Sequence, residues 1–168
     1  MSIDYFVSRF WRVASIIGFG VTLLFIYRGL PDPTAVHFGE SGRGDGFLPK
    51  EEVFYLVSGV VIFINVLILL LAKNVEKIPN LSNLLFLSIF KSKGDQFIKA
   101  TIVHWIHLLA AGINTYLIFV LRVLLLLNDD RTFGQDFSYI IWLGYSLLIL
   151  WVLYLPLRLF FSPDWKEE

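Results

Sequence analysis

The sequence predicts an all-α fold, a polytopic four-helix transmembrane bundle, from three observations. Of the 168 residues, 57% are hydrophobic and 17% are charged, and the mean hydropathy is +0.70, which is too apolar for an ordinary soluble domain. Four apolar runs are long enough to cross a bilayer core, which needs about 20 helical residues. Lysines and arginines gather in the connections on one side of these runs, as the positive-inside rule describes for a cytoplasmic face.

The four runs form a single membrane domain, residues 1–168, with helices in an up-down-up-down order. The first run is expected to be a retained helix, because no small-x-small cleavage pattern of a signal peptide follows it. Its Arg28 reaches the membrane interface along an apolar stem. The predicted helices cover about residues 13–30, 53–72, 100–127 and 138–161.

The charges of the connections predict the orientation. The cytoplasmic loop, residues 73–99, contains five lysines, and further basic residues lie before the first helix and after the last. We therefore expect an inner or plasma membrane protein with both termini in the cytoplasm. The outer segments 31–52 and 128–137 are mainly acidic: they contain Asp32, Glu40, Asp45, Glu51, Glu52, Asp129, Asp130 and Asp136 beside Arg43, Lys50 and Arg131.

A short apolar stretch, Leu81 to Phe90, lies inside the cytoplasmic loop and is too short to span a membrane. We expect a short interfacial helix there, with Asn80 or Ser82 as its N-cap and the nearby lysines facing anionic lipid head groups. The expected partners are the lipid bilayer and a peptide or a membrane protein. We expect no nucleic-acid partner, because a net charge of zero gives no reason to expect one.

The outer motif loop, residues 31–52, has the composition of an ordered, turn-rich segment. Between Pro31 and Lys50 it contains three prolines, which fix backbone angles, and four glycines, which permit tight turns. Two phenylalanines are available to pack the loop. Its candidate binding residues are His37, Glu40, Asp45 and Lys50.

The order of residues in this loop resembles a family signature. The matching residues are Leu30-Pro31-Asp32, His37-Phe38, Gly42, Asp45-Gly46 and Lys50. This pattern is similar to that of the domain of unknown function 1648, found in small bacterial membrane proteins that include SdpI-type immunity proteins. In that family the signature lies between the first two transmembrane helices, and the similarity covers roughly residues 13–72. The resemblance implies a non-enzymatic protein that recognises a peptide, a toxin or an envelope partner through this loop.

Two interpretations apply to the polar residues of the loop. His37, Glu40 and Asp45 could bind a divalent metal or titrate together with external pH. Alternatively, His37 and Asp45 brace the turn through hydrogen bonds to backbone groups, as short polar side chains in glycine-rich loops commonly do. We favour the bracing role, and we expect no cofactor and no metal.

Four polar residues fall inside the predicted spans: Asn65, His104, His107 and Asn114. The two histidines are three residues apart and share a helix face, which suits a metal pair but lacks a third ligand. We expect His107 to bond Asn65 at a similar depth, and Asn114 to bond another helix, with Tyr145 as the candidate partner.

No catalytic motif accompanies these residues. The sequence contains no glycine-rich phosphate loop, no His-Glu-x-x-His and no nucleophile elbow, so we expect no enzymatic activity. Two alternatives to recognition remain open. One is a small transporter or transport subunit that uses the intramembrane polar residues, and the other is a membrane metal-site enzyme.

Overall fold

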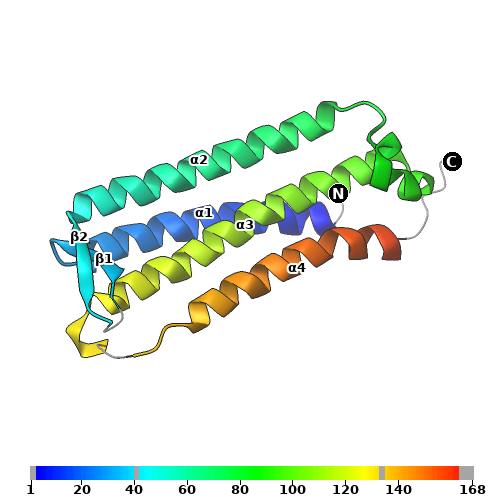
Figure 1. The fold of residues 1–168 in the computed structure, drawn as a ribbon. Coiled ribbons are helices and arrows are strands. Elements are labelled where there is room, and N and C mark those ends of the chain that lie inside the picture. The colour runs from blue at the N-terminus through cyan, green and yellow to red at the C-terminus, as the bar shows by residue number, and fades with distance from the viewer. Residues whose placement is uncertain (1–2, 40–41, 133–134, 163–168) are drawn as a thin grey trace.

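The computed structural model of the chain describes residues 3–39, 42–132 and 135–162. Four long helices lie side by side and alternate in direction (Figure 1). Each is long and apolar enough to cross a membrane, which confirms the predicted all-α four-helix bundle. The helices are α1 (Ile3–Gly29), α2 (Lys50–Lys77), α3 (Asp95–Leu127) and α4 (Tyr139–Phe161).

The helices mostly extend beyond the apolar runs that predicted them. α1 begins at Ile3, ten residues before the predicted start, and α3 begins at Asp95. Hydropathy marks the part of a helix that lies in lipid, whereas the helix continues as long as its backbone hydrogen bonds are made within the segment. Polar residues near the start of α1 fit this extension, because the Ser8 and Ser15 hydroxyls donate to the carbonyls of Tyr5 and Arg12.

Helix α3 lies at the centre of the bundle and packs against α1, α2 and α4. The outer part of the bundle, near the end of α1, has an apolar core between α1, α2 and α3. Side chains facing away from this core are exposed and apolar, which is what a lipid-facing helix surface requires. The core consists of Phe19, Leu23, Ile26, Leu30, Val53, Val61 and Leu121.

Helix α4 packs chiefly against α3, and a tryptophan pair joins the two helices. The rings of Trp105 and Trp151 stack with their centroids 4.2 Å apart. Each indole Nε1 donates to the backbone carbonyl of the other tryptophan at 2.8 Å. Nearer the outer end, a Cβ on Gly144 would lie 2.9 Å from the Tyr116 ring, so a glycine permits the close approach there.

The cytoplasmic loop corrects one prediction. Instead of a regular α-helix it forms two 3₁₀ segments, η1 (Leu81–Asn83) and η2 (Leu85–Lys93), which are separated at Leu84. The expected caps are wrong. Asn80 precedes η1 with φ +49° but makes no side-chain cap bond. Ser82 lies inside η1, and its backbone N–H donates to Asp95 Oδ1 at 2.9 Å. The tight turns bury Leu81 and Leu87 against α3 and α4, so this segment packs on the bundle.

The outer loop also differs from the prediction, because it contains two short strands. Strands β1 (Thr34–Phe38) and β2 (Gly44–Leu48) form an antiparallel hairpin. The hairpin lies at one end of the bundle with η3 (Asp130–Thr132), and η1 and η2 lie at the other (Figure 1). The first turn of α1 and the last turn of α4 are at the η1 and η2 end. The hairpin is therefore at the pole opposite the lysine-rich loop.

Candidate functional site

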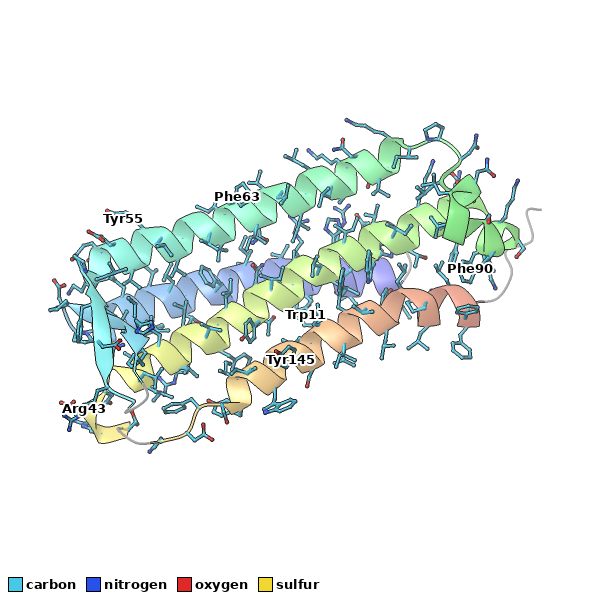
Figure 2. All side chains as sticks on the ribbon, in the orientation of Figure 1. Trp11, Arg43, Tyr55, Phe63, Phe90 and Tyr145 are labelled. Atoms are coloured by element: carbon cyan, nitrogen blue, oxygen red, sulfur yellow. The ribbon has the colours of Figure 1, made fainter. Side chains whose placement is uncertain are left out.

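The hairpin is the candidate functional site, and its turn explains part of the loop's glycine content. The Gly39 N–H donates to the Arg43 carbonyl at 3.0 Å, and the Gly42 N–H donates to the Gly39 carbonyl at 2.9 Å. Gly42 has φ +75°, a left-handed conformation that favours glycine. In Figure 2 the Arg43 side chain lies at the outer end of the molecule, beside η3.

Each strand of the hairpin contains a β-bulge. Ala35 pairs with Phe47 and His37 pairs with Gly46, so Val36 is an extra residue on β1. Phe38 pairs with Gly44, so Asp45 is an extra residue on β2. Bulges redirect side chains and interrupt regular alternation.

The two faces of the hairpin are established by its glycines. A Cβ on Gly44 would lie 2.5 Å from Ala35 Cβ and 3.3 Å from Phe47 Cζ, so these two side chains share one face. A Cβ on Gly46 would lie 2.9 Å from His37 Cβ, so the His37 side chain covers Gly46 on the other face. The first face is apolar, and the second carries the polar pair of the hairpin.

The structure brings together two of the predicted site residues, His37 and Asp45. His37 Nδ1 contacts Asp45 Oδ1, and the side chains are 75% and 53% exposed. The contact joins the two side chains directly. It joins the bulged residue of β2 to β1, and it leaves the pair accessible from outside.

The other predicted loop residues lie elsewhere. Lys50 begins α2, beyond the end of β2. Its N–H donates to Asp32 Oδ1 at 3.3 Å, and its Nζ lies 5.4 Å from the centre of the Tyr27 ring. The structure does not place Lys50 with His37 and Asp45. Glu40 lies outside the described residues.

Asn128 fastens the hairpin to the end of α3. Its Oδ1 accepts the Ala35 N–H at 2.8 Å, and its Nδ2 donates to the Ala35 carbonyl at 3.0 Å. The same Nδ2 donates to the Leu124 carbonyl at 2.9 Å, which fixes the amide to the helix. Asn128 thus gives the outer edge of β1 the pair of bonds that a neighbouring strand would supply.

The outer edge of β2, in contrast, is open at Phe47. In an antiparallel pair the backbone groups of opposite residues point either toward each other or away from each other. Ala35 turns its backbone away from β2, toward Asn128, so its partner Phe47 turns its N–H and carbonyl away from β1. Apart from the ladder of the hairpin itself, no described residue bonds these two groups, and the Phe47 side chain is 55% exposed.

The surroundings of the hairpin are acidic. Exposed carboxylates lie on the loop before β1, in the first turn of α2 and in the segment between α3 and α4. In that last segment, the backbone N–H and hydroxyl of Ser138 donate to Asp136 and hold the pKa of its carboxyl below the usual range. The described carboxylates of this end, Asp32, Asp45, Glu51, Glu52, Asp129, Asp130 and Asp136, outnumber its described basic residues Arg28, Arg43, Lys50 and Arg131.

Inside the membrane, Asn65 and Asn114 form a reciprocal amide pair. Asn65 Nδ2 donates to Asn114 Oδ1 at 2.8 Å, and Asn114 Nδ2 donates to Asn65 Oδ1 at 3.2 Å. Asn114 also donates to the Ser15 hydroxyl at 3.3 Å, so three helices meet at this point. The expected bonds from Asn65 to His107 and from Asn114 to Tyr145 are wrong, because Asn114 faces α1 and α2 and its amide is bonded by Asn65 and Ser15.

His107 pairs with α1 rather than with Asn65. Arg12 Nη1 lies 3.0 Å from His107 Nδ1, and the His104 ring packs edge-on to the Tyr5 ring with centroids 5.9 Å apart. These contacts continue the polar contacts of Asn114 toward the end of the bundle where η1 and η2 lie. Toward the outer end they give way to the apolar core at Phe19.

The buried polar groups of the bundle have hydrogen-bond partners. Among the described residues, no buried side-chain nitrogen or oxygen lacks a hydrogen-bond partner. In the same part of the chain, no three histidine, aspartate or glutamate side chains gather in a way that could hold a metal ion. The geometry of the intramembrane residues is therefore that of helix-to-helix contacts.

No family model, curated protein or solved structure matches this chain.

Sequence reasoning missed Asn128, Arg12 and Ser15. Arg12 and Ser15 lie on one face of α1 at helical spacing, together with Ser8. That face would have been visible if the first helix had been extended before Val13. Asn128 follows α3 directly, and a polar amide at a helix end is a common capping signal, but nothing local indicates that its partner is Ala35.

Proposed function

We propose that this chain is a non-enzymatic, multi-pass protein of a bacterial inner or plasma membrane that recognises a peptide or an envelope partner through its outer hairpin. Both termini lie in the cytoplasm in this proposal, because the lysine-rich loop is at the end of the bundle where α1 begins and α4 ends. The observation that carries the proposal is the docking of the hairpin: Asn128 bonds both backbone groups of Ala35. A docked hairpin presents its exposed residues in one geometry, which lowers the entropic cost of binding.

The resemblance to the domain of unknown function 1648 supports the same role. Three residues of that pattern contact one another in the hairpin: Asp45 contacts His37, and the His37 side chain covers Gly46. The pattern thus describes a defined hairpin, and an SdpI-like immunity function would use this surface.

The transport alternative receives less support from the packing. A transporter needs polar groups along its pathway. Here the polar contacts of Ser15, Asn65 and Asn114 end at the apolar core around Phe19 and Leu121. The metal-site alternative is weaker for a similar reason, because Arg12 occupies the Nδ1 side of His107.

Photo-crosslinking from the hairpin tests the proposal. A benzophenone amino acid replaces Phe47, which is 55% exposed, and in a matched control it replaces Tyr55, which is 71% exposed on α2. In native membranes we expect a protein or peptide adduct from position 47 that position 55 does not give. The substitution Asn128→Leu should weaken that adduct, because it releases the hairpin.

Identical products from the two positions would contradict the proposal, as would the absence of any protein or peptide adduct from position 47. Membrane abundance of each variant is compared first, so that loss of an adduct is not confused with loss of the protein.

A further inference from the structure

The two edges of the hairpin are unequal. The edge of β1 is occupied by Asn128, whereas the edge of β2 turns the N–H and carbonyl of Phe47 away from β1, and no described residue outside the hairpin bonds them. An open strand edge is a template for another strand, and peptide recognition commonly uses it. The hairpin is docked on the helix end through its other edge, so β2 is the side on which a further strand can be added.

The side chains beside this edge define what the added strand should carry. Phe47 lies on the apolar face with Ala35, and Asp45 lies with His37 on the other. Because side chains alternate between the faces of a strand, a partner with alternating apolar and polar residues matches both faces. The excess of carboxylates around the hairpin favours positive charge at the polar positions.

From this arrangement we propose that the partner is an extended cationic peptide segment that pairs with β2 as a third strand. This inference rests on the proposed function and specifies its partner. A second copy of the chain is a poorer occupant, because two hairpins paired through β2 would bring two acidic surfaces together.

A synthetic hexapeptide of alternating lysine and valine, with a fluorescent label, is the probe. Its counterpart has glutamate in place of lysine. The full-length protein is held in nanodiscs of neutral phosphatidylcholine, so that the lipid does not attract the peptide, and empty nanodiscs are the control. We expect the lysine peptide to bind at least about tenfold more tightly than the glutamate peptide, with an affinity that falls as salt rises.

Two substitutions of one residue separate the backbone contact from the side-chain contact. Phe47→Pro removes the outward N–H and the ring, whereas Phe47→Ala removes the ring alone. Proline is tolerated on strand edges where the N–H faces solvent, so the hairpin ladder should persist. We expect Phe47→Pro to weaken lysine-peptide binding about tenfold more than Phe47→Ala does. Equal affinities for the two variants would overturn strand addition.

A second measurement leaves the backbone unaltered, in case Phe47→Pro disturbs the hairpin. The protein is labelled with nitrogen-15 phenylalanine, and the amide signal of Phe47 is identified by its absence from the spectrum of Phe47→Tyr. The hydrogen exchange of this amide is then followed with and without the lysine peptide. Slower exchange on binding is expected, and an unchanged rate in the saturated complex would overturn the inference. If neither peptide binds while the position-47 crosslink is found in native membranes, this inference fails and the proposed function stands.

Discussion

The side chain of Asn128 and the backbone of Ala35 form a two-bond pair of the kind that neighbouring strands form, although the residues are 93 positions apart in the chain. This pair connects the outer hairpin to the central helix α3. Because Asn128 also bonds the Leu124 carbonyl, the amide cannot rotate freely. The orientation of the hairpin on the bundle therefore depends strongly on one side chain.

Replacing Asn128 should release the hairpin without unfolding the bundle. Asn128→Leu leaves the Ala35 N–H and carbonyl unpaired, at a local cost of about 1–3 kcal/mol. We expect trypsin added from outside to cleave after Arg43 faster in this variant than in the wild type, at equal membrane abundance. Asp129→Ala is the matched control, since Asp129 bonds the Arg131 N–H within its own segment. Equal cleavage of the wild type and Asn128→Leu would show that the hairpin is not docked by Asn128.

The hairpin should tolerate loss of its polar contact better than loss of a glycine. His37 and Asp45 are largely exposed, so Asp45→Ala should cost less than about 1 kcal/mol. Gly46→Ala places a Cβ 2.9 Å from His37 Cβ, and relief of such overpacking typically costs about 1–3 kcal/mol. Gly59→Ala in α2 meets nothing within 4 Å and is the control. Faster tryptic cleavage of Asp45→Ala than of Gly46→Ala would contradict this order.

The helices were predictable because the length of an apolar run can be read from each segment without knowledge of its tertiary contacts. The run from residue 53 to residue 72 predicted α2, since a lipid-spanning backbone must satisfy its own hydrogen bonds. The ends were less predictable, because Ile3 and Asp95 begin helices in sequence that is not apolar. The contact of His37 with Asp45 was within reach, since it depends on residues of one short loop.

The hairpin strands and the interhelical contacts were beyond sequence reasoning for physical reasons. β2 contains two glycines and a bulge, which conceal the alternation by which a strand is recognised. The pairing of Asn65 with Asn114 instead of His107 depends on how the helices rotate against one another. Helix rotation is set by packing, and composition does not reveal it.

The Asn65 and Asn114 amides should show energetic coupling. Asn65→Leu leaves one amide of the pair without its partner, and so does Asn114→Leu, whereas the double substitution removes both polar groups. Interhelical bonds in membranes contribute roughly 0.5–2 kcal/mol, so each single variant should unfold at lower detergent concentration. We expect the double variant to lose less than the sum of the single losses, as measured by dodecyl sulfate titration in mixed micelles. Additive losses would contradict a direct pair.

The orientation of the chain can be tested cleanly because the sequence contains no cysteine. Single cysteines replace Val36 in the hairpin, Gln135 in the outer connection and Ile89 in η2, all of which are exposed. In intact cells an impermeant thiol reagent should label the first two and spare the third, which should react only after the membrane is opened. Labelling of Ile89→Cys in intact cells, with protection of the others, would reverse the proposed topology.

The contact between Arg12 and His107 can be tested by substitution. A guanidinium in a helix interface needs a hydrogen-bond acceptor, and the imidazole of His107 supplies one. His107→Gln keeps an acceptor near Arg12 and should leave stability within about 1 kcal/mol of the wild type. His107→Leu leaves the Arg12 guanidinium short of a partner, and hydrogen bonds to charged groups contribute about 1.5–3 kcal/mol. The double variant Arg12→Leu/His107→Leu should recover much of that loss in the same dodecyl sulfate titration. Two results would contradict this pairing: equal destabilisation by His107→Gln and His107→Leu, or stoichiometric zinc in the purified protein that is lost in His107→Gln. Either result would indicate that the imidazole is a metal ligand, and it would support the metal-site alternative.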